Sequence, residues 1–184
     1  MPEAIGLLEL SSIAMGYEVE DAVLKAADVR LLVARTICSG KYLVVVGGTV
    51  AAVNSSVEAG VNLAEEGLID QIVIPNVHPS VFPAITGVVD LSPDAMSALG
   101  IIETFSASSA VESADTAVKA GSVTLFRIHL AMAVGGKGFV LMTGDVAGCR
   151  AAVEAGAAAA SSHGLLVNKV VIPRPRLELF GEYI

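Results

Sequence analysis

The sequence predicts an α/β (α+β) protein that contains two tandem copies of one small domain. Three observations lead to this prediction. Blocks of residues recur in the same order in both halves. Short apolar and β-branched runs alternate with helical patterns. The chain length of 184 residues also suffices for two domains of about 90 residues each. We expect the first domain at 1–78, a linker at 79–96 and the second domain at 97–184.

The internal repeat is the most informative feature of the chain. Residues 4–9 (AIGLLE) return as 98–103 (ALGIIE), and residues 57–60 (VEAG) return unchanged as 153–156. Three more blocks recur in the same order: Asp21, Lys25 and Val29 as Asp115, Lys119 and Val123, residues 48–51 (GTVA) as 144–147 (GDVA), and residues 73–75 (VIP) as 171–173 (VIP). Chance does not produce five collinear blocks, so both halves are expected to share one fold.

The first elements of the repeating unit follow from its apolar periodicity. Residues 4–10 form an apolar run of strand length. Residues 19–27 carry apolar side chains at the spacing of one helical face, which predicts an amphipathic helix. Residues 29–37 are rich in β-branched side chains, which favour a strand.

The remaining elements complete the unit. Residues 42–46 form the next strand after a turn at 38–41, and residues 50–64 have valines and alanines at helical spacing. Residues 72–74 form the last strand, which Pro75 ends. The order strand, helix, strand, strand, helix, strand is the split-βαβ, ferredoxin-like arrangement. The proline-containing segment that follows is the expected linker.

The composition excludes several classes of protein. Hydrophobic residues make up 54% of the chain and charged residues 16%, against a usual charged fraction of about 25%. No apolar run reaches the roughly 20 residues that a membrane-spanning helix needs. The first residues do not combine a charged segment with a following apolar segment, so we expect no signal peptide. The net charge of −8 without a basic stripe argues against nucleic acid as a partner. We expect a soluble cytoplasmic protein that packs against copies of itself, with Gly6 and Gly100 allowing close approach between subunits.

Motifs of common enzymes are missing from the sequence. Gly40-Lys41 and Gly136-Lys137 lack the glycine that a phosphate-binding loop requires five positions before its second glycine. There is no G-x-S-x-G element, and the three histidines have no second ligand at metal-binding spacing. We therefore do not expect an enzyme.

Several stretches resemble the signature of the bacterial microcompartment shell domain, the BMC domain. They are residues 144–147 (GDVA), the alanine-rich helix that follows and residues 171–175 (VIPRP). The resemblance covers both halves, and two such domains in unpermuted order resemble the trimeric shell proteins. The propanediol-utilisation type is the most similar; the shared stretches are 36–38 (TIC), 76–81 (NVHPSV), 127–129 (RIH) and 135–137 (GGK).

This resemblance implies a homotrimer in which three chains imitate a hexamer as a flat disc, a pseudohexamer. Such discs tile with other microcompartment shell proteins into a shell in the bacterial cytoplasm. Lys25 and Lys119 match the edge lysine of the family, and Arg174 matches its edge arginine. The alternative for the two lysines is a solvated helix face. An encapsulated redox enzyme stays open as a further partner.

The resemblance also assigns a role to Cys38. It implies one [4Fe–4S] cluster per trimer, on the threefold axis and ligated by Cys38 of three chains. An iron–sulfur cube takes four ligands, usually thiolates, so one iron is left for an outside ligand. The central loops comprise Ile37, Ser39, Gly40 and Lys41 from the first copy and Met132, Ala133, Val134, Gly135 and Gly136 from the second. Cys149 is expected to be a packed core thiol.

Three functions remain open at this point. The first is a shell tile whose cluster passes electrons, or is delivered, across the shell. The second is a cluster-free tile whose central loops admit a small metabolite, with Cys38 as pore lining. The third is a ferredoxin-like small-molecule sensor. Backbone amides near Cys38 suit an anionic cluster, and Lys41 would add positive charge if it points inward, a direction that the sequence does not determine.

Overall fold

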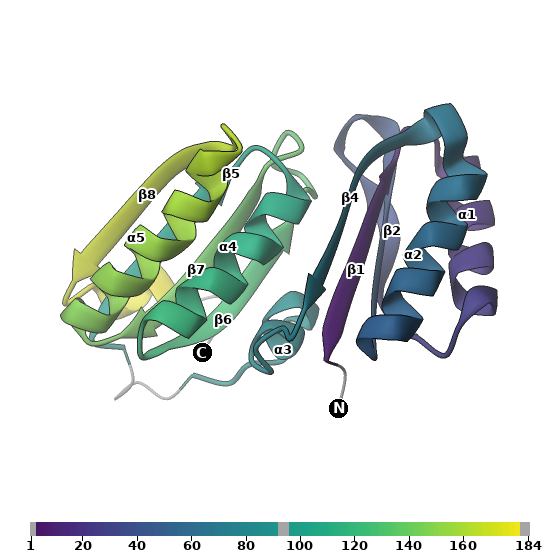
Figure 1. The fold of residues 1–184 in the computed structure, drawn as a ribbon. Coiled ribbons are helices and arrows are strands. Elements are labelled where there is room, and N and C mark those ends of the chain that lie inside the picture. The colour runs from purple at the N-terminus through teal and green to yellow at the C-terminus, as the bar shows by residue number, and fades with distance from the viewer. Residues whose placement is uncertain (1–2, 92–95, 181–184) are drawn as a thin grey trace. The chain divides into compact units, whose positions relative to one another are not determined.

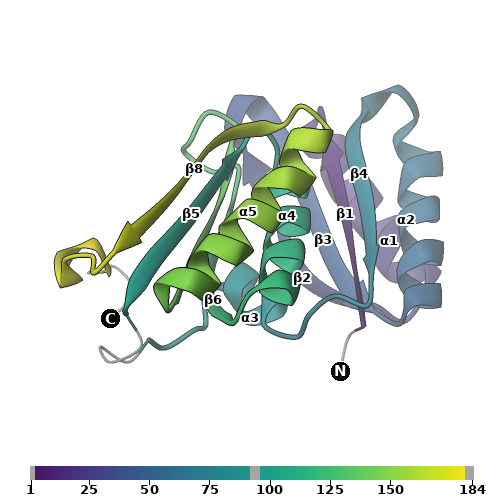
Figure 2. The same cartoon turned by 60° about the vertical axis from the view of Figure 1, so that its left-hand side comes forward.

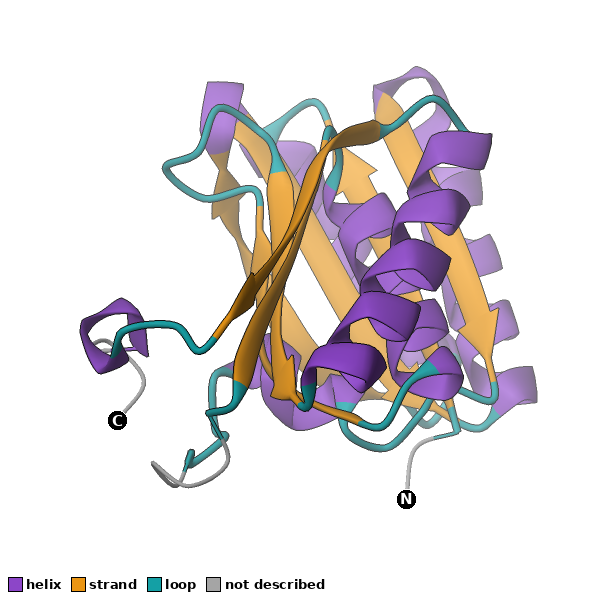
Figure 3. Ribbon diagram, turned by 90° about the vertical axis from the view of Figure 1, so that its left-hand side faces the viewer, coloured by secondary structure: helices purple, strands orange, loops and turns teal. Residues whose placement is uncertain are grey.

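The computed structural model describes residues 3–91 and 96–180. The chain divides into two compact units, Met1–Pro79 and Ser80–Ile184. Each unit contains a four-stranded sheet with two long helices packed on one face (Figures 1 and 3). This confirms the predicted fold class, two tandem domains of mixed helix and strand.

The first unit has the element order that the repeat predicts. Its elements are β1 (Ala4–Leu10), α1 (Ile13–Ala26), β2 (Arg30–Ile37), β3 (Lys41–Gly48), α2 (Val50–Ala64) and β4 (Leu68–Pro75). The strand order is β2-β3-β1-β4, and every pair is antiparallel. β1 and β2 thus run in the same direction with β3 between them, which is the split-βαβ arrangement.

The second unit repeats this topology with one additional helix. Its elements are α3 (Val81–Thr86), β5 (Ala98–Thr104), α4 (Ala107–Ala120), β6 (Val123–Leu130), β7 (Gly138–Gly144), α5 (Val146–Ser162), β8 (Leu166–Pro173) and a final 3-10 turn (Leu177–Phe180). The strand order β6-β7-β5-β8 matches that of the first sheet. Figure 1 labels the four strands of the second sheet, and Figure 2 shows both sheets from another side. The register also repeats, because Leu10 faces Tyr42 in the first sheet and Thr104 faces Gly138 in the second.

Side-chain caps determine where the helices begin. The Ser12 hydroxyl accepts a hydrogen bond from the Met15 amide, and Ser106 does the same for Ser109. Such a cap satisfies an amide at the helix start that has no partner within the helix. The prediction that the first helix begins at residue 19 was therefore wrong, because α1 begins at Ile13, directly after its cap.

The helix layer packs closely on each sheet. A Cβ added to Gly6 would lie 2.5 Å from Val57 Cγ2, and one added to Gly100 would lie 2.9 Å from Val153 Cγ2. A side chain at either position would overlap the second helix of its unit. These two glycines thus allow helix and sheet to approach within each unit, which corrects the expectation that they serve contacts between subunits.

The segment that was predicted as a linker, residues 79–96, is largely part of the second unit. α3 packs on β6 and α4. Leu91 and Met96 lie in a buried cluster with Leu99, Phe126 and Phe180, while residues 92–95 lie outside the described residues. Leu99 alternates along β5 with Gly100, which faces α5, so this cluster covers the sheet face opposite the helices.

Candidate functional site

Cys38 lies in the short turn that joins β2 to β3. The turn consists of the single 3-10 turn Cys38–Gly40, and Ile37 and Lys41 form the last strand pair before it. Ser39 (φ 65°) and Gly40 (φ 72°) both adopt left-handed backbone. A Cβ added to Gly40 would meet no atom within 4 Å, so that side of the turn is open. The Cys38 side chain is partly exposed and is not in a disulfide.

One chain supplies a single thiol at this turn. Within residues 3–91 and 96–180, no three or more His, Cys, Asp or Glu side chains are grouped to hold a metal ion. Cys149 is fully buried in α5 of the second unit. A partly exposed thiol on a tight, open turn suits cluster ligation, but several ligands must converge. The residues present therefore fit a [4Fe–4S] cluster only if copies of the chain bring three Cys38 side chains together.

Lys41 follows the turn and is engaged in an ion pair. Its Nζ donates a hydrogen bond to Oε1 of Glu9 at 2.7 Å. The Glu9 side chain is only 6% exposed and that of Lys41 31%. The structure thus shows the Lys41 charge paired with a carboxylate of β1, a contact that the sequence did not indicate.

Tyr42 anchors the same hairpin to the helix layer. Its hydroxyl donates to Glu20 of α1 at 2.8 Å, and its ring contacts Tyr17 with centroids 5.0 Å apart. Burial, followed by the hydrogen bond to the Glu20 carboxylate, raises the pKa of Tyr42 well above its usual range. The phenol therefore stays protonated. Gly16 of α1 leaves room for the ring, because a Cβ there would overlap it.

Sequence reasoning missed Tyr42 and Glu20. The available signal was a difference between the two copies. Tyr42 corresponds to Gly138 in the repeat, since both pair with the last residue of the first strand in their sheets.

The turn between β6 and β7 is longer and contains no cysteine. Ala131 (φ 54°) and Ala133 (φ 60°) adopt left-handed backbone, which is strained for a residue with a Cβ. Gly135 (φ 67°) and Gly136 (φ 83°) share this conformation without that penalty. Four residues of this turn are thus left-handed, and two of them are alanines, for which this backbone conformation is unfavourable.

Side chains at the base of this turn hold it in place. His129 Nε2 donates to the carbonyl oxygen of Met132 at 2.6 Å, and the imidazole stacks on Phe139 with centroids 4.7 Å apart. The Lys137 amide donates to the carbonyl oxygen of Val134 at 3.4 Å. Met132 and Ala133 are exposed at the tip. The second predicted loop is thus tied to its strands by His129 rather than by a buried tyrosine.

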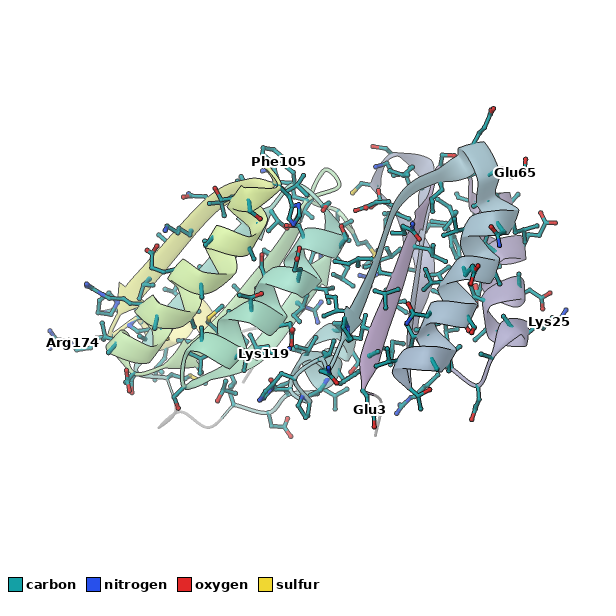
Figure 4. All side chains as sticks on the ribbon, viewed as in Figure 1. Glu3, Lys25, Glu65, Phe105, Lys119 and Arg174 are labelled. Atoms are coloured by element: carbon teal, nitrogen blue, oxygen red, sulfur yellow. The ribbon has the colours of Figure 1, made fainter. Side chains whose placement is uncertain are left out.

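The predicted edge residues lie at the ends of helices and strands. Lys25 is in the last turn of α1 and Lys119 in the last turn of α4 (Figure 4). Each binds the aspartate four residues earlier, at 2.5 Å for Asp21 and 2.6 Å for Asp115. Arg174 is exposed directly after β8, with left-handed backbone (φ 47°).

Comparisons with known proteins agree with this architecture. The family model described as BMC domain matches residues 4–77 and 98–175. The chain is 46% identical over 184 residues to the bacterial microcompartment shell protein PduT of Citrobacter freundii, and the alignment covers 100% of this chain and 99% of the relative. It is 45% identical over 84 residues to the shell protein EutM of Salmonella typhimurium, and this alignment covers 46% of this chain and 85% of the relative.

A solved structure extends the likeness to three dimensions. The crystal structure of a microcompartment protein from Desulfitobacterium hafniense is similar with a TM-score of 0.93 at 51% identity, and the match covers 97% of this chain and 98% of that one. In the part of the chain that the structure describes, no helix has the length and apolar character to cross a membrane. The chain belongs to the BMC-domain family of bacterial microcompartment shell proteins.

Proposed function

We propose that this chain is a structural tile of a bacterial microcompartment shell and that it works as a homotrimer. Family membership supports the shell role, which places the protein in the microcompartment shell within the cytoplasm, next to other shell proteins. Two copies of one domain per chain support the trimer, because three chains then provide the repeated surfaces of a hexamer. The role is structural rather than enzymatic.

Contacts between tiles are assigned to Lys25, Lys119 and Arg174. The side chains of both lysines are accessible, at 75% exposure for Lys25 and 44% for Lys119. Each is also oriented by an aspartate on its own helix. Long, ordered cations at equivalent helix ends suit repeated side-by-side packing. Loss of ordered sheets in a Lys25→Ala/Lys119→Ala variant, seen by electron microscopy with the trimer intact, would support this assignment; unchanged sheets would refute it.

The finer part of the proposal is a [4Fe–4S] cluster held by Cys38 of three chains. When bound, such a cluster supplies one-electron chemistry, which would serve electron or cluster transfer across the shell. The supporting observation is the partly exposed Cys38 thiol on a tight turn that is open on one side. Cys38 is the ligand, and Ser39 and Gly40, both with left-handed backbone, form the rest of the same turn. An encapsulated redox enzyme is the corresponding partner.

Anaerobic purification tests the cluster directly. We expect a brown trimer with about four irons, the content of one cube. Cys38→Ala should lose the iron and keep the trimer, whereas the matched variant Cys149→Ala should keep both. A wild-type protein that takes up no iron after reconstitution would exclude the cluster. It would leave the cluster-free tile for metabolite passage as the function of the central loops.

A further inference from the structure

The base of the turn that carries Cys38 is held by a carboxylate from another strand. Glu9 lies on β1, where it pairs with Leu43 of β3, and its carboxylate accepts a hydrogen bond from the Lys41 ammonium at 2.7 Å. Lys41 in turn faces Ile37, the residue before Cys38. Lys41, three positions after Cys38, is therefore bound to a nearly buried acid.

Burial makes this pair persistent. A carboxylate with 6% side-chain exposure has lost most of its hydration, and an unpaired charge in that position is strongly unfavourable. The Lys41 side chain is more exposed, at 31%, but breaking the ion pair would leave the Glu9 carboxylate buried without a counterion. The ammonium is thus retained on the sheet, and its charge is balanced there.

We propose that Glu9 is a positioning residue that sets the electrostatic environment of Cys38 by neutralising Lys41. With the pair intact, the Lys41 charge at the base of the turn is balanced. Any three Cys38 thiolates, or an anionic cluster that they hold, then face no unbalanced charge from Lys41. The thiol is less reactive than it would be beside an unbalanced ammonium, and a cluster has a lower reduction potential, because positive charge favours its more negative, reduced state.

The second unit offers a matched pair without a cysteine. Lys137 donates to Glu103 at 2.8 Å, in the position that corresponds to Lys41 and Glu9. This pair is more exposed, at 41% for Lys137 and 34% for Glu103. Removing the Glu103 charge is thus the same chemical change at the base of a turn that has no thiol.

The test measures the alkylation rate of Cys38 by iodoacetamide at neutral pH in the cluster-free trimer, on a Cys149→Ala background. Glu9→Gln keeps the shape and one acceptor oxygen but leaves the Lys41 charge unbalanced, so the rate constant should rise on the order of threefold. Glu9→Gln/Lys41→Met removes both charges and should return the rate to the wild-type value. Glu103→Gln should leave it unchanged. Size-exclusion chromatography checks that each variant is still a trimer.

Two results would overturn the proposal. One is an unchanged rate in Glu9→Gln; the other is an equal increase in the single and double variants, which would assign the effect to packing instead of charge. A second readout rests on the proposed function: the midpoint potential of a bound cluster should rise in Glu9→Gln and return in the double variant. If the wild type binds no iron, the cluster proposal fails while the alkylation rates still decide the role of Glu9.

Discussion

The two turns that join the middle strands differ more than the sheets that carry them. In the first unit, Tyr42 fills the space between helix and sheet beside the turn, and Gly16 makes room for it. In the second unit Gly138 stands in place of Tyr42 and Ala110 in place of Gly16, so no aromatic ring separates strand and helix. A Cβ added to Gly138 would lie 2.6 Å from that of Ala110.

This difference shows how one fold can carry two different loops. In each unit one of the two facing positions is glycine, so strand and helix pack there without overlap. The first unit uses the space for an aromatic anchor below a short turn with a cysteine. The second leaves its turn longer and ties it through His129. The anchored turn suits a residue that must be held in position.

The largest expected effect comes from adding a methyl group under Tyr42. Gly16→Ala forces the new Cβ into the ring, and overpacking of this kind costs about 2–3 kcal/mol of unfolding free energy. The matched change Ala110→Gly removes a methyl group at the equivalent site and should cost only about 1 kcal/mol, mainly from helix propensity. Urea unfolding measures both. A Gly16→Ala variant as stable as the wild type would contradict the packing described for the first unit.

The next largest effect is a loss of stability at high pH that comes from Cys149. Val53 is the counterpart of Cys149 in the first copy. Burial, and then the nearby Asp145 carboxylate, raises the pKa of the Cys149 thiol from 9.0 to about 11. A raised pKa means that the neutral thiol stabilises the fold below pH 9.0 and that this contribution is lost as the pH rises to about 11.

The wild type should accordingly lose on the order of 2 kcal/mol over this range relative to Cys149→Val. If the unfolding free energies of the two proteins change equally with pH over this range, the prediction is contradicted, because the thiol then ionises as readily in the folded state as in the unfolded state.

A smaller effect is expected from the hydroxyl group of Tyr42. Tyr42→Phe keeps the ring and removes the hydrogen bond to Glu20, which should cost about 1 kcal/mol. Hydrogen exchange of the amides at residues 38–41 should also become faster, because the hairpin loses one tie to α1. Glu20→Gln retains an acceptor and serves as the control. Unchanged exchange in Tyr42→Phe would show that the hydroxyl does not hold the turn.

The last comparison, which includes the smallest expected effect, concerns the aspartates that bind Lys25 and Lys119. Asp21 and Lys25 are both exposed, so Asp21→Asn should change the unfolding free energy by less than about 0.5 kcal/mol. Asp115 has 8% side-chain exposure, so Asp115→Asn should cost about 1 kcal/mol. Equal effects in thermal or urea unfolding would show that the difference in burial between the two copies has no energetic consequence.

The sequence was sufficient for the fold class, because the repeat and the apolar periodicity belong to contiguous segments. β1 and α2 have the predicted bounds. α1 was predicted too short, because Gly16 and Tyr17 interrupt its apolar pattern and its cap, Ser12, lies seven positions before the periodic stretch that begins at residue 19. α3 was not predicted, because Pro83 was interpreted as a loop signal, although proline is tolerated in the first turn of a helix.

The site was only partly predictable. Cys38 and the loop residues could be proposed as site residues from the family resemblance and from their place between two strands. The partners of Lys41 and Tyr42 do not, because each contact joins residues that are far apart in sequence. Such contacts depend on strand register and on which helix faces which strand, neither of which local periodicity determines.

Native mass spectrometry of the anaerobically purified protein tests the central claim most directly. We predict an assembly of three 18.7 kDa chains that carries the additional mass of one [4Fe–4S] cluster, and a bare trimer for Cys38→Ala. A different number of chains, or a trimer of Cys38→Ala that still carries the cluster mass, would contradict the convergence of three Cys38 side chains on one axis.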